Sequence, residues 1–120
     1  MISVVLFSDD FRIEDNPALY NASLQSSQII PVYIYSEDYL GRKLGEASKV
    51  FLFGVLNSFS NLLKEEYGCN LIIKKGEKIE ELKKIIFETG AKKVFFNKSY
   101  TAKETKIEDQ IKENFECESF

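Results

Sequence analysis

Short apolar runs alternate with amphipathic segments along the whole chain. Five runs are rich in β-branched and aromatic residues, which is typical of buried strands: 2–7, 28–36, 70–74, 93–97 and 115–120. The segments between them carry apolar residues at helical spacing: 17–26, 47–67, 78–89 and 102–114. This alternation predicts one α/β domain over residues 1–120. We expect a doubly wound parallel sheet of about five strands between two layers of helices.

Capping residues support these helix ends. Asn16 and Pro17 suit an N-cap and a first helical residue, and Gly68 and Gly90 suit the ends of two helices. The longest helical segment has an apolar stripe that is predicted to face the core. Phe53, outside this stripe, is also predicted to be a core residue. The stripe consists of Phe51, Leu52, Val55, Leu56, Phe59, Leu62 and Leu63.

Composition excludes several classes of function. The chain has 16 Lys and Arg against 19 Asp and Glu, a formal net charge of -3, so we expect no direct binding of DNA by this chain. It has no histidine, which removes His-based acid–base catalysis and most zinc sites. Its 2 cysteines, together with the absence of a signal peptide or a long apolar run, predict a cytoplasmic protein without a membrane span.

The loop after the first strand is the first candidate site, because ligands bind at the carboxyl edge of such sheets. It holds the carboxylates of Asp9, Asp10, Glu14 and Asp15. A metal or carboxylate-pair site is one interpretation, and acids that cap the next helix are the favoured one. Arg12 lies among these acids, and we expect it to pair with one of them.

The loop after the fourth strand reaches the same edge. Asn97 and Tyr100 lie there, where they either face a ligand or serve a turn and ring packing. No glycine-rich phosphate cradle is present, because Ser8 and its neighbours contain no glycine and the segment 41–45 lacks the Walker A spacing. We therefore expect neither a classical nicotinamide function nor a P-loop function.

Five segments resemble one family. Residues 6–19, LFSDDFRIEDNPAL, resemble the N-terminal signature of the DNA photolyase/cryptochrome family, approximately W-F-R-R-D-L-R-x-x-D-N-P-A-L. In the same order, 30–35 (IPVYIY), 45–52 (GEASKVFL), 71–76 (LIIKKG) and 97–100 (NKSY) resemble I-P-V-F-I-Y, G-x-A-S-R-W-W-L, L-V-I-R-x-G and N-x-x-Y. Each match is weak alone, but five in order along the chain are specific.

The resemblance implies a Rossmann-like domain that supports a helical domain and helps to hold an antenna chromophore, a folate or a deazaflavin. FAD, light-driven repair of pyrimidine dimers in DNA and the catalytic residues belong to the helical domain, beyond residue 120. We therefore expect no catalytic residue and no metal in this chain. We expect a truncated or split photolyase, inactive without a separately encoded FAD-binding helical domain. The candidate chromophore-binding residues are Ser8, Asp9, Asp10, Arg12, Asn97, Tyr100 and Thr101.

The chain departs from the family pattern at this edge. Ser8 and Asp9 replace two arginines, which predicts weaker binding of an anionic chromophore. Thr101 replaces a glutamate that contacts folate in some members. Two other functions stay open: a free-standing nucleotide-binding module of the universal-stress-protein type, and a structural remnant without a ligand.

Overall fold

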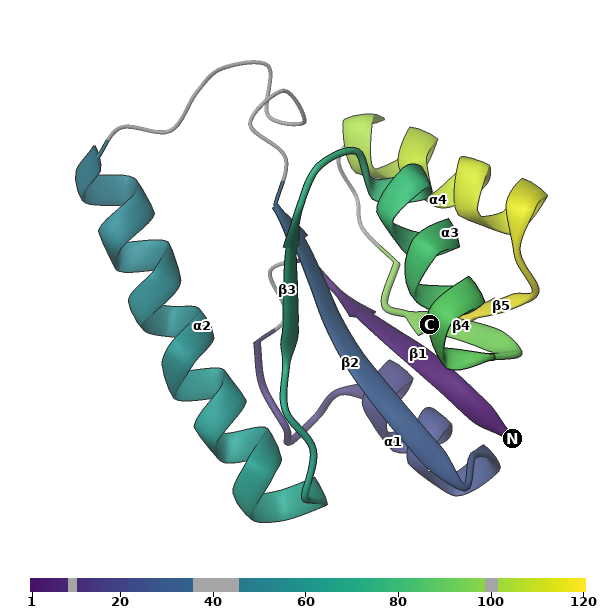
Figure 1. Ribbon diagram of the computed structural model, residues 1–120, viewed down its shortest axis with the longest axis horizontal. Helices are drawn as coiled ribbons and strands as arrows, with labels where there is room; N and C mark the ends of the chain where they lie inside the picture. Colours follow the sequence, from purple (N-terminus) through teal and green to yellow (C-terminus); the bar gives the residue numbers. More distant parts are fainter. Residues whose placement is uncertain (9–10, 36–45, 99–101) are drawn as a thin grey trace.

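The computed structural model describes residues 1–8, 11–35, 46–98 and 102–120. Within these ranges, strands and helices alternate in nine elements (Figure 1). The strands are β1 (Ile2–Phe7), β2 (Gln28–Tyr35), β3 (Ile72–Lys75), β4 (Lys93–Phe96) and β5 (Cys117–Ser119). The helices are α1 (Pro17–Gln25), α2 (Glu46–Tyr67), α3 (Lys78–Thr89) and α4 (Ala102–Asn114).

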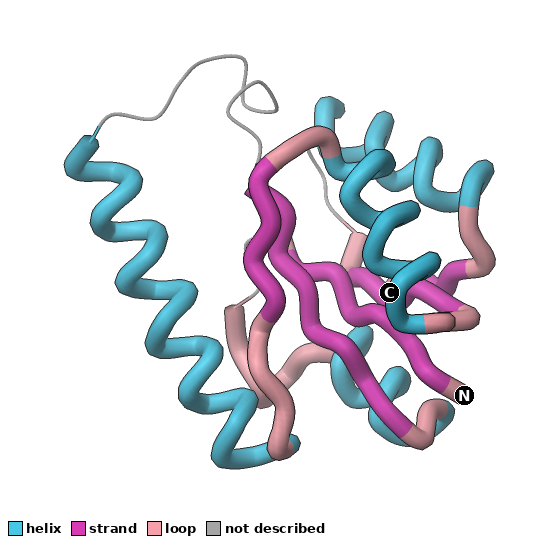
Figure 2. Tube along the Cα trace, in the orientation of Figure 1, coloured by secondary structure: helices cyan, strands magenta, loops and turns pink. Residues whose placement is uncertain are grey.

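All five strands are parallel, in the order β3-β2-β1-β4-β5. Helices α1 and α2 lie on one face of the sheet, and α3 and α4 lie on the other (Figures 1 and 2). The predicted doubly wound α/β fold is confirmed. The strand order reverses between β1 and β4, because the chain builds outward through β2 and β3 and then returns to the other side of β1.

The central strand β1 shows why its sequence is a continuous apolar run. Val5 and Phe7 pack under α1 and α2, while Val4 and Leu6 pack under α3 and α4. Both faces of this strand are thus buried, as expected for a parallel sheet covered by helices on both sides.

Two predicted core positions on α2 are wrong. The helix packs through Leu56, Phe59 and Leu63, whereas Phe53 and Leu62 are 45% and 46% exposed. The apolar stripe on α2 is wider than the surface it buries, and its flanking positions face outward. The side chain of Phe51 lies outside the described residues.

Gly76, between β3 and α3, has a backbone that disfavours any other residue. Its φ is +152°, and a Cβ atom at this position would lie 2.8 Å from Glu81 Oε1. We predict that Gly76→Ala lowers the free energy of unfolding by about 1–3 kcal/mol, measured by chemical denaturation.

Gly54 is the matched control for this substitution. It lies within α2, and a methyl group added to it would meet no neighbouring atom within 4 Å, so Gly54→Ala should stabilise the chain by about 0.5–1 kcal/mol. Equal effects of the two substitutions would contradict the assignment of strain to Gly76.

Candidate functional site at the carboxyl edge of the sheet

The carboxyl ends of β1 and β4 lie side by side where the strand order reverses. Leu6 pairs with Phe96 in the ladder, so Ser8 and Asn97 follow these strands at the same edge. Ligands of open α/β sheets bind in the crevice at such a reversal. The topology therefore brings together two of the residues selected from the sequence.

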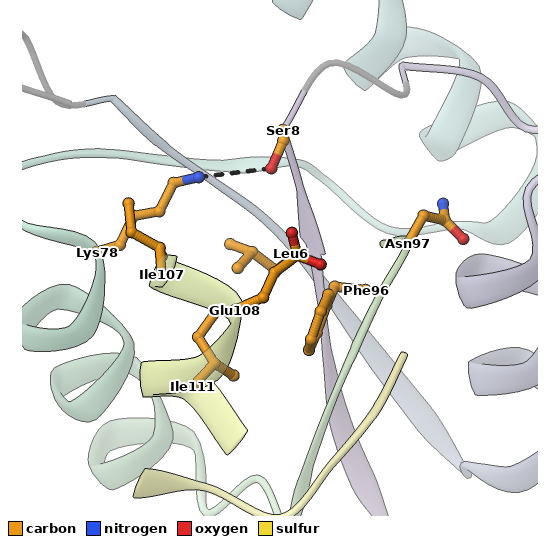
Figure 3. A pocket seen from close by; sticks show the side chains of 8 residues that line it. All are labelled: Leu6, Ser8, Lys78, Phe96, Asn97, Ile107, Glu108 and Ile111. Atoms are coloured by element: carbon orange, nitrogen blue, oxygen red, sulfur yellow. Dashed lines mark hydrogen bonds between the residues drawn. The ribbon is translucent and has the colours of Figure 1, made fainter. Parts of the chain in front are cut away.

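A small polar cluster lies below this edge (Figure 3). The Lys78 ammonium donates to Ser8 Oγ at 3.4 Å, and the Glu108 side chain extends from α4 toward the same edge. Lys78 is only 6% exposed. The cavity between these side chains measures about 10 Å³, which is room for one water molecule and not for a chromophore.

A second network ties the edge to the start of α1. The buried Asn16 accepts from the Leu19 N–H at 3.2 Å and from Asn97 Nδ2 at 2.7 Å, and its own amide donates to the Arg12 carbonyl at 3.0 Å. Asn97 Oδ1 accepts from the Ala18 N–H at 3.0 Å. The predicted Asn16 cap is confirmed, and the amide of Asn97 is bonded within the fold.

Arg12 makes a contact that the sequence did not predict. Its Nε donates to the main-chain carbonyl of Asp15 at 2.9 Å, so the acceptor is a peptide group and not the Asp15 carboxylate. Asp15 itself has a φ of +53°, and the bond closes the turn that precedes α1. This geometry makes Arg12 a turn-stabilising residue. Four other candidates lie outside the described residues: Asp9, Asp10, Tyr100 and Thr101.

An open groove of about 470 Å³ lies elsewhere, between the start of α1 and the end of α2. Glu14 and Asp15 line it together with the rings of Tyr20 and Tyr67. The two acids are thus separated from the Ser8–Lys78 cluster. Among the described residues, no group of acidic or cysteine side chains is placed to hold a metal ion, and no helix is long and apolar enough to cross a membrane.

The loop after β1 is anchored by aromatic packing. The Phe11 ring lies 5.3 Å from that of Tyr33 and 5.6 Å from that of Phe59, centroid to centroid. Burial, and then the neighbouring Tyr35, raise the pKa of Tyr33, so its phenol stays neutral around neutral pH. These contacts hold the described part of the loop against the α1–α2 face.

Comparison with known proteins decides the family. A family model described as DNA photolyase matches residues 3–120. The chain belongs to the DNA photolyase family. A deoxyribodipyrimidine photo-lyase of Agrobacterium fabrum is 35% identical over 97 residues, which are 81% of this chain and 20% of that protein.

Solved structures of photolyases agree with this assignment. A bacterial class III photolyase from Agrobacterium tumefaciens superposes with a TM-score of 0.83 at 29% identity, over 98% of this chain and 25% of that one. An archaeal photolyase from Sulfolobus tokodaii, described as holding two FAD molecules, superposes with a TM-score of 0.77 at 25% identity. The match covers 100% of this chain and 29% of that one. The chain therefore spans about a quarter of the length of these photolyases, and it resembles their N-terminal domain.

The photolyase signature explains some site residues and not others. It contains Asn16 and Asn97, whose amides join the loops after β1 and β4. Lys78 and Glu108 could not be selected from the sequence, because a lysine at a helix start and a glutamate within a helix usually face solvent. The available signal was position: Lys78 follows the turn after β3, which topology places at the carboxyl edge.

Proposed function

We propose that this chain is the light-harvesting domain of a photolyase-type flavoprotein. The observation that carries the proposal is the match of residues 3–120 to the family model, combined with coverage of 20% and 25% of two photolyase relatives. The Sulfolobus tokodaii structure is described as implying a novel light-harvesting cofactor, and this chain covers 29% of that protein. A folate, a deazaflavin or a second flavin is the candidate chromophore here.

The described residues fit a chromophore that lies over the carboxyl edge. The cavity beneath the edge measures about 10 Å³, so a ring system has no room within it. Ser8 offers a hydroxyl at this edge, and Lys78 places a cation next to it. Asn97 and Arg12 serve the fold through main-chain acceptors and donors. The chromophore would supply absorption of near-ultraviolet or blue light, and the protein would hold and orient it.

A FAD-binding helical domain is the proposed partner. Flavin chemistry and contact with damaged DNA would belong to that domain. The acidic balance of this chain, 16 Lys and Arg against 19 Asp and Glu, supports an arrangement in which the helical domain and not this chain binds the DNA backbone.

A binding experiment tests the proposal. The purified chain is equilibrated separately with methenyltetrahydrofolate, 8-hydroxydeazaflavin and FAD, and the protein fraction is collected by gel filtration. We expect one of these chromophores to co-elute and to show a shifted absorption band, because binding moves its ring out of water.

The groove supplies the control for this assay. Tyr20→Ala alters the groove between α1 and α2 and leaves the carboxyl edge intact, so it should not change chromophore retention. A colourless protein fraction with all three chromophores would refute the light-harvesting function. Binding of ATP in the same assay would instead support the nucleotide-binding alternative.

A further inference from the structure

Lys78 lies beside a position where the chain departs from the photolyase signature. The signature has two arginines where this chain has Ser8 and Asp9. The first of these positions, Ser8, receives a hydrogen bond from the Lys78 ammonium at 3.4 Å. The cation comes from the first turn of α3, 70 residues along the chain from Ser8.

We propose that Lys78 is a specificity-determining residue of the carboxyl edge, where it supplies the positive charge that the family signature places in the loop after β1. The edge then favours a ligand that carries an anionic group near Ser8. This inference rests on the proposed function for the identity of the ligand. The charge itself can be tested without any chromophore.

The surroundings of Lys78 allow this role. Its stem is buried against the α3–α4 side of the sheet, so the ammonium is held in place instead of moving through solvent. The Glu108 side chain lines the same cavity from α4 (Figure 3). A charge in such a partly dehydrated position acts more strongly on a neighbour than one in water.

The main-chain N–H groups at the N-terminus of α3 are a second possible source of anion binding at this edge. The Glu77 side chain caps this helix and accepts from the N–H groups of Ile79 and Glu80 at 3.3 and 3.0 Å. Two of the amide groups that could bind an anion are thus engaged. The side chain of Lys78 is the described cation that reaches Ser8.

A thiol at position 8 measures the charge directly. Ser8→Cys is made in a chain in which Cys69 and Cys117 are replaced by alanine, and the pKa of the new thiol is read from its rate of alkylation against pH. A cation beside a thiol stabilises the thiolate and lowers its pKa below the usual value of about 8.5. We expect adding Lys78→Met to raise that pKa by about one unit.

Two further variants separate charge from packing. Lys78→Arg keeps the cation and should keep the lowered pKa, while Lys83→Met removes an exposed lysine of the same helix and should change nothing. The proposal is overturned if Lys78→Met leaves the thiol pKa unchanged, or if Lys83→Met has the same effect. Circular dichroism of each variant confirms that the fold is retained. If Lys78→Met does not fold, Lys78→Arg still tests the proposal. A thiol pKa in Lys78→Arg that is no lower than the usual value of about 8.5 refutes it.

The consequence for ligands is tested with FMN and riboflavin, which share a ring system and differ by a phosphate. The wild-type chain should prefer FMN about tenfold, and Lys78→Met should remove that preference without weakening riboflavin binding. An unchanged preference would contradict the role in specificity. If neither flavin binds, and none of the chromophores named above binds either, the light-harvesting function is contradicted. The thiol pKa would still show whether Lys78 places a positive charge at Ser8.

Discussion

Replacing Asn16 by alanine is expected to lower the free energy of unfolding by about 2–4 kcal/mol. Asn16 is 3% exposed, and its side chain bonds to Leu19, Asn97 and Arg12 among the described residues. Alanine would leave the buried Leu19 N–H and the part-buried Arg12 carbonyl without these partners. Chemical denaturation followed by circular dichroism measures the loss.

Two control substitutions show whether the network carries this effect. Asn16→Asp keeps an acceptor for Leu19 and Asn97 but removes the donor to Arg12, so its cost should be smaller, about 1 kcal/mol. Asn21→Ala removes an exposed bond to the Pro17 carbonyl of α1 and should cost less than about 0.5 kcal/mol. Equal losses of unfolding free energy for Asn16→Ala and Asn21→Ala would contradict a stabilising role of the Asn16 hydrogen bonds.

The second large effect is predicted at Phe59, a buried aromatic residue of α2. Its ring is 2% exposed and lies 4.9 Å from that of Phe7 and 5.6 Å from that of Phe11. We expect Phe59→Ala to lower the free energy of unfolding by about 3–5 kcal/mol. The substitution leaves a cavity between α2, β1 and the loop after β1. The melting temperature and the free energy of unfolding report the change.

Leu62 on the same helix is the control, since it is 46% exposed. Leu62→Ala should cost at most about 1 kcal/mol. Phe59→Ala should also loosen the loop after β1, because Phe11 loses one of the two ring partners that the described residues provide. Proteolysis in this loop would then increase in Phe59→Ala and not in Leu62→Ala. A loss at Phe59 no larger than that at Leu62 would contradict the packing described for α2.

Periodicity predicted the order of the nine elements but not every boundary. The third strand was expected at residues 70–74 and lies at Ile72–Lys75, because β3 begins to pair only where Ile72 meets Val32. Apolar character alone placed Leu71 in the strand, and Leu71 is indeed buried, but it precedes the ladder. Burial can be read from residue type, whereas pairing depends on a neighbouring strand that is distant in sequence.

The candidate site was predicted less completely than the fold. The rule for open α/β sheets located Ser8 and Asn97 at the carboxyl edge. It could not predict that the Asn97 amide bonds to Ala18 and Asn16, since that depends on how α1 lies on β4. Nor could it predict Lys78, whose side chain reaches Ser8 from another helix start. Long-range side-chain partners of this kind leave little trace in a single sequence.

The position of a bound chromophore tests the central claim most directly. In a ¹⁵N–¹H correlation spectrum, titration with the chromophore that co-elutes should shift the amide signals at the ends of β1, β2 and β4, among them Ser8, Tyr35 and Asn97. Signals of the groove residues Tyr20 and Tyr67 should stay in place. Shifts confined to the groove, or no shifts at saturating chromophore, would contradict a light-harvesting site at the carboxyl edge.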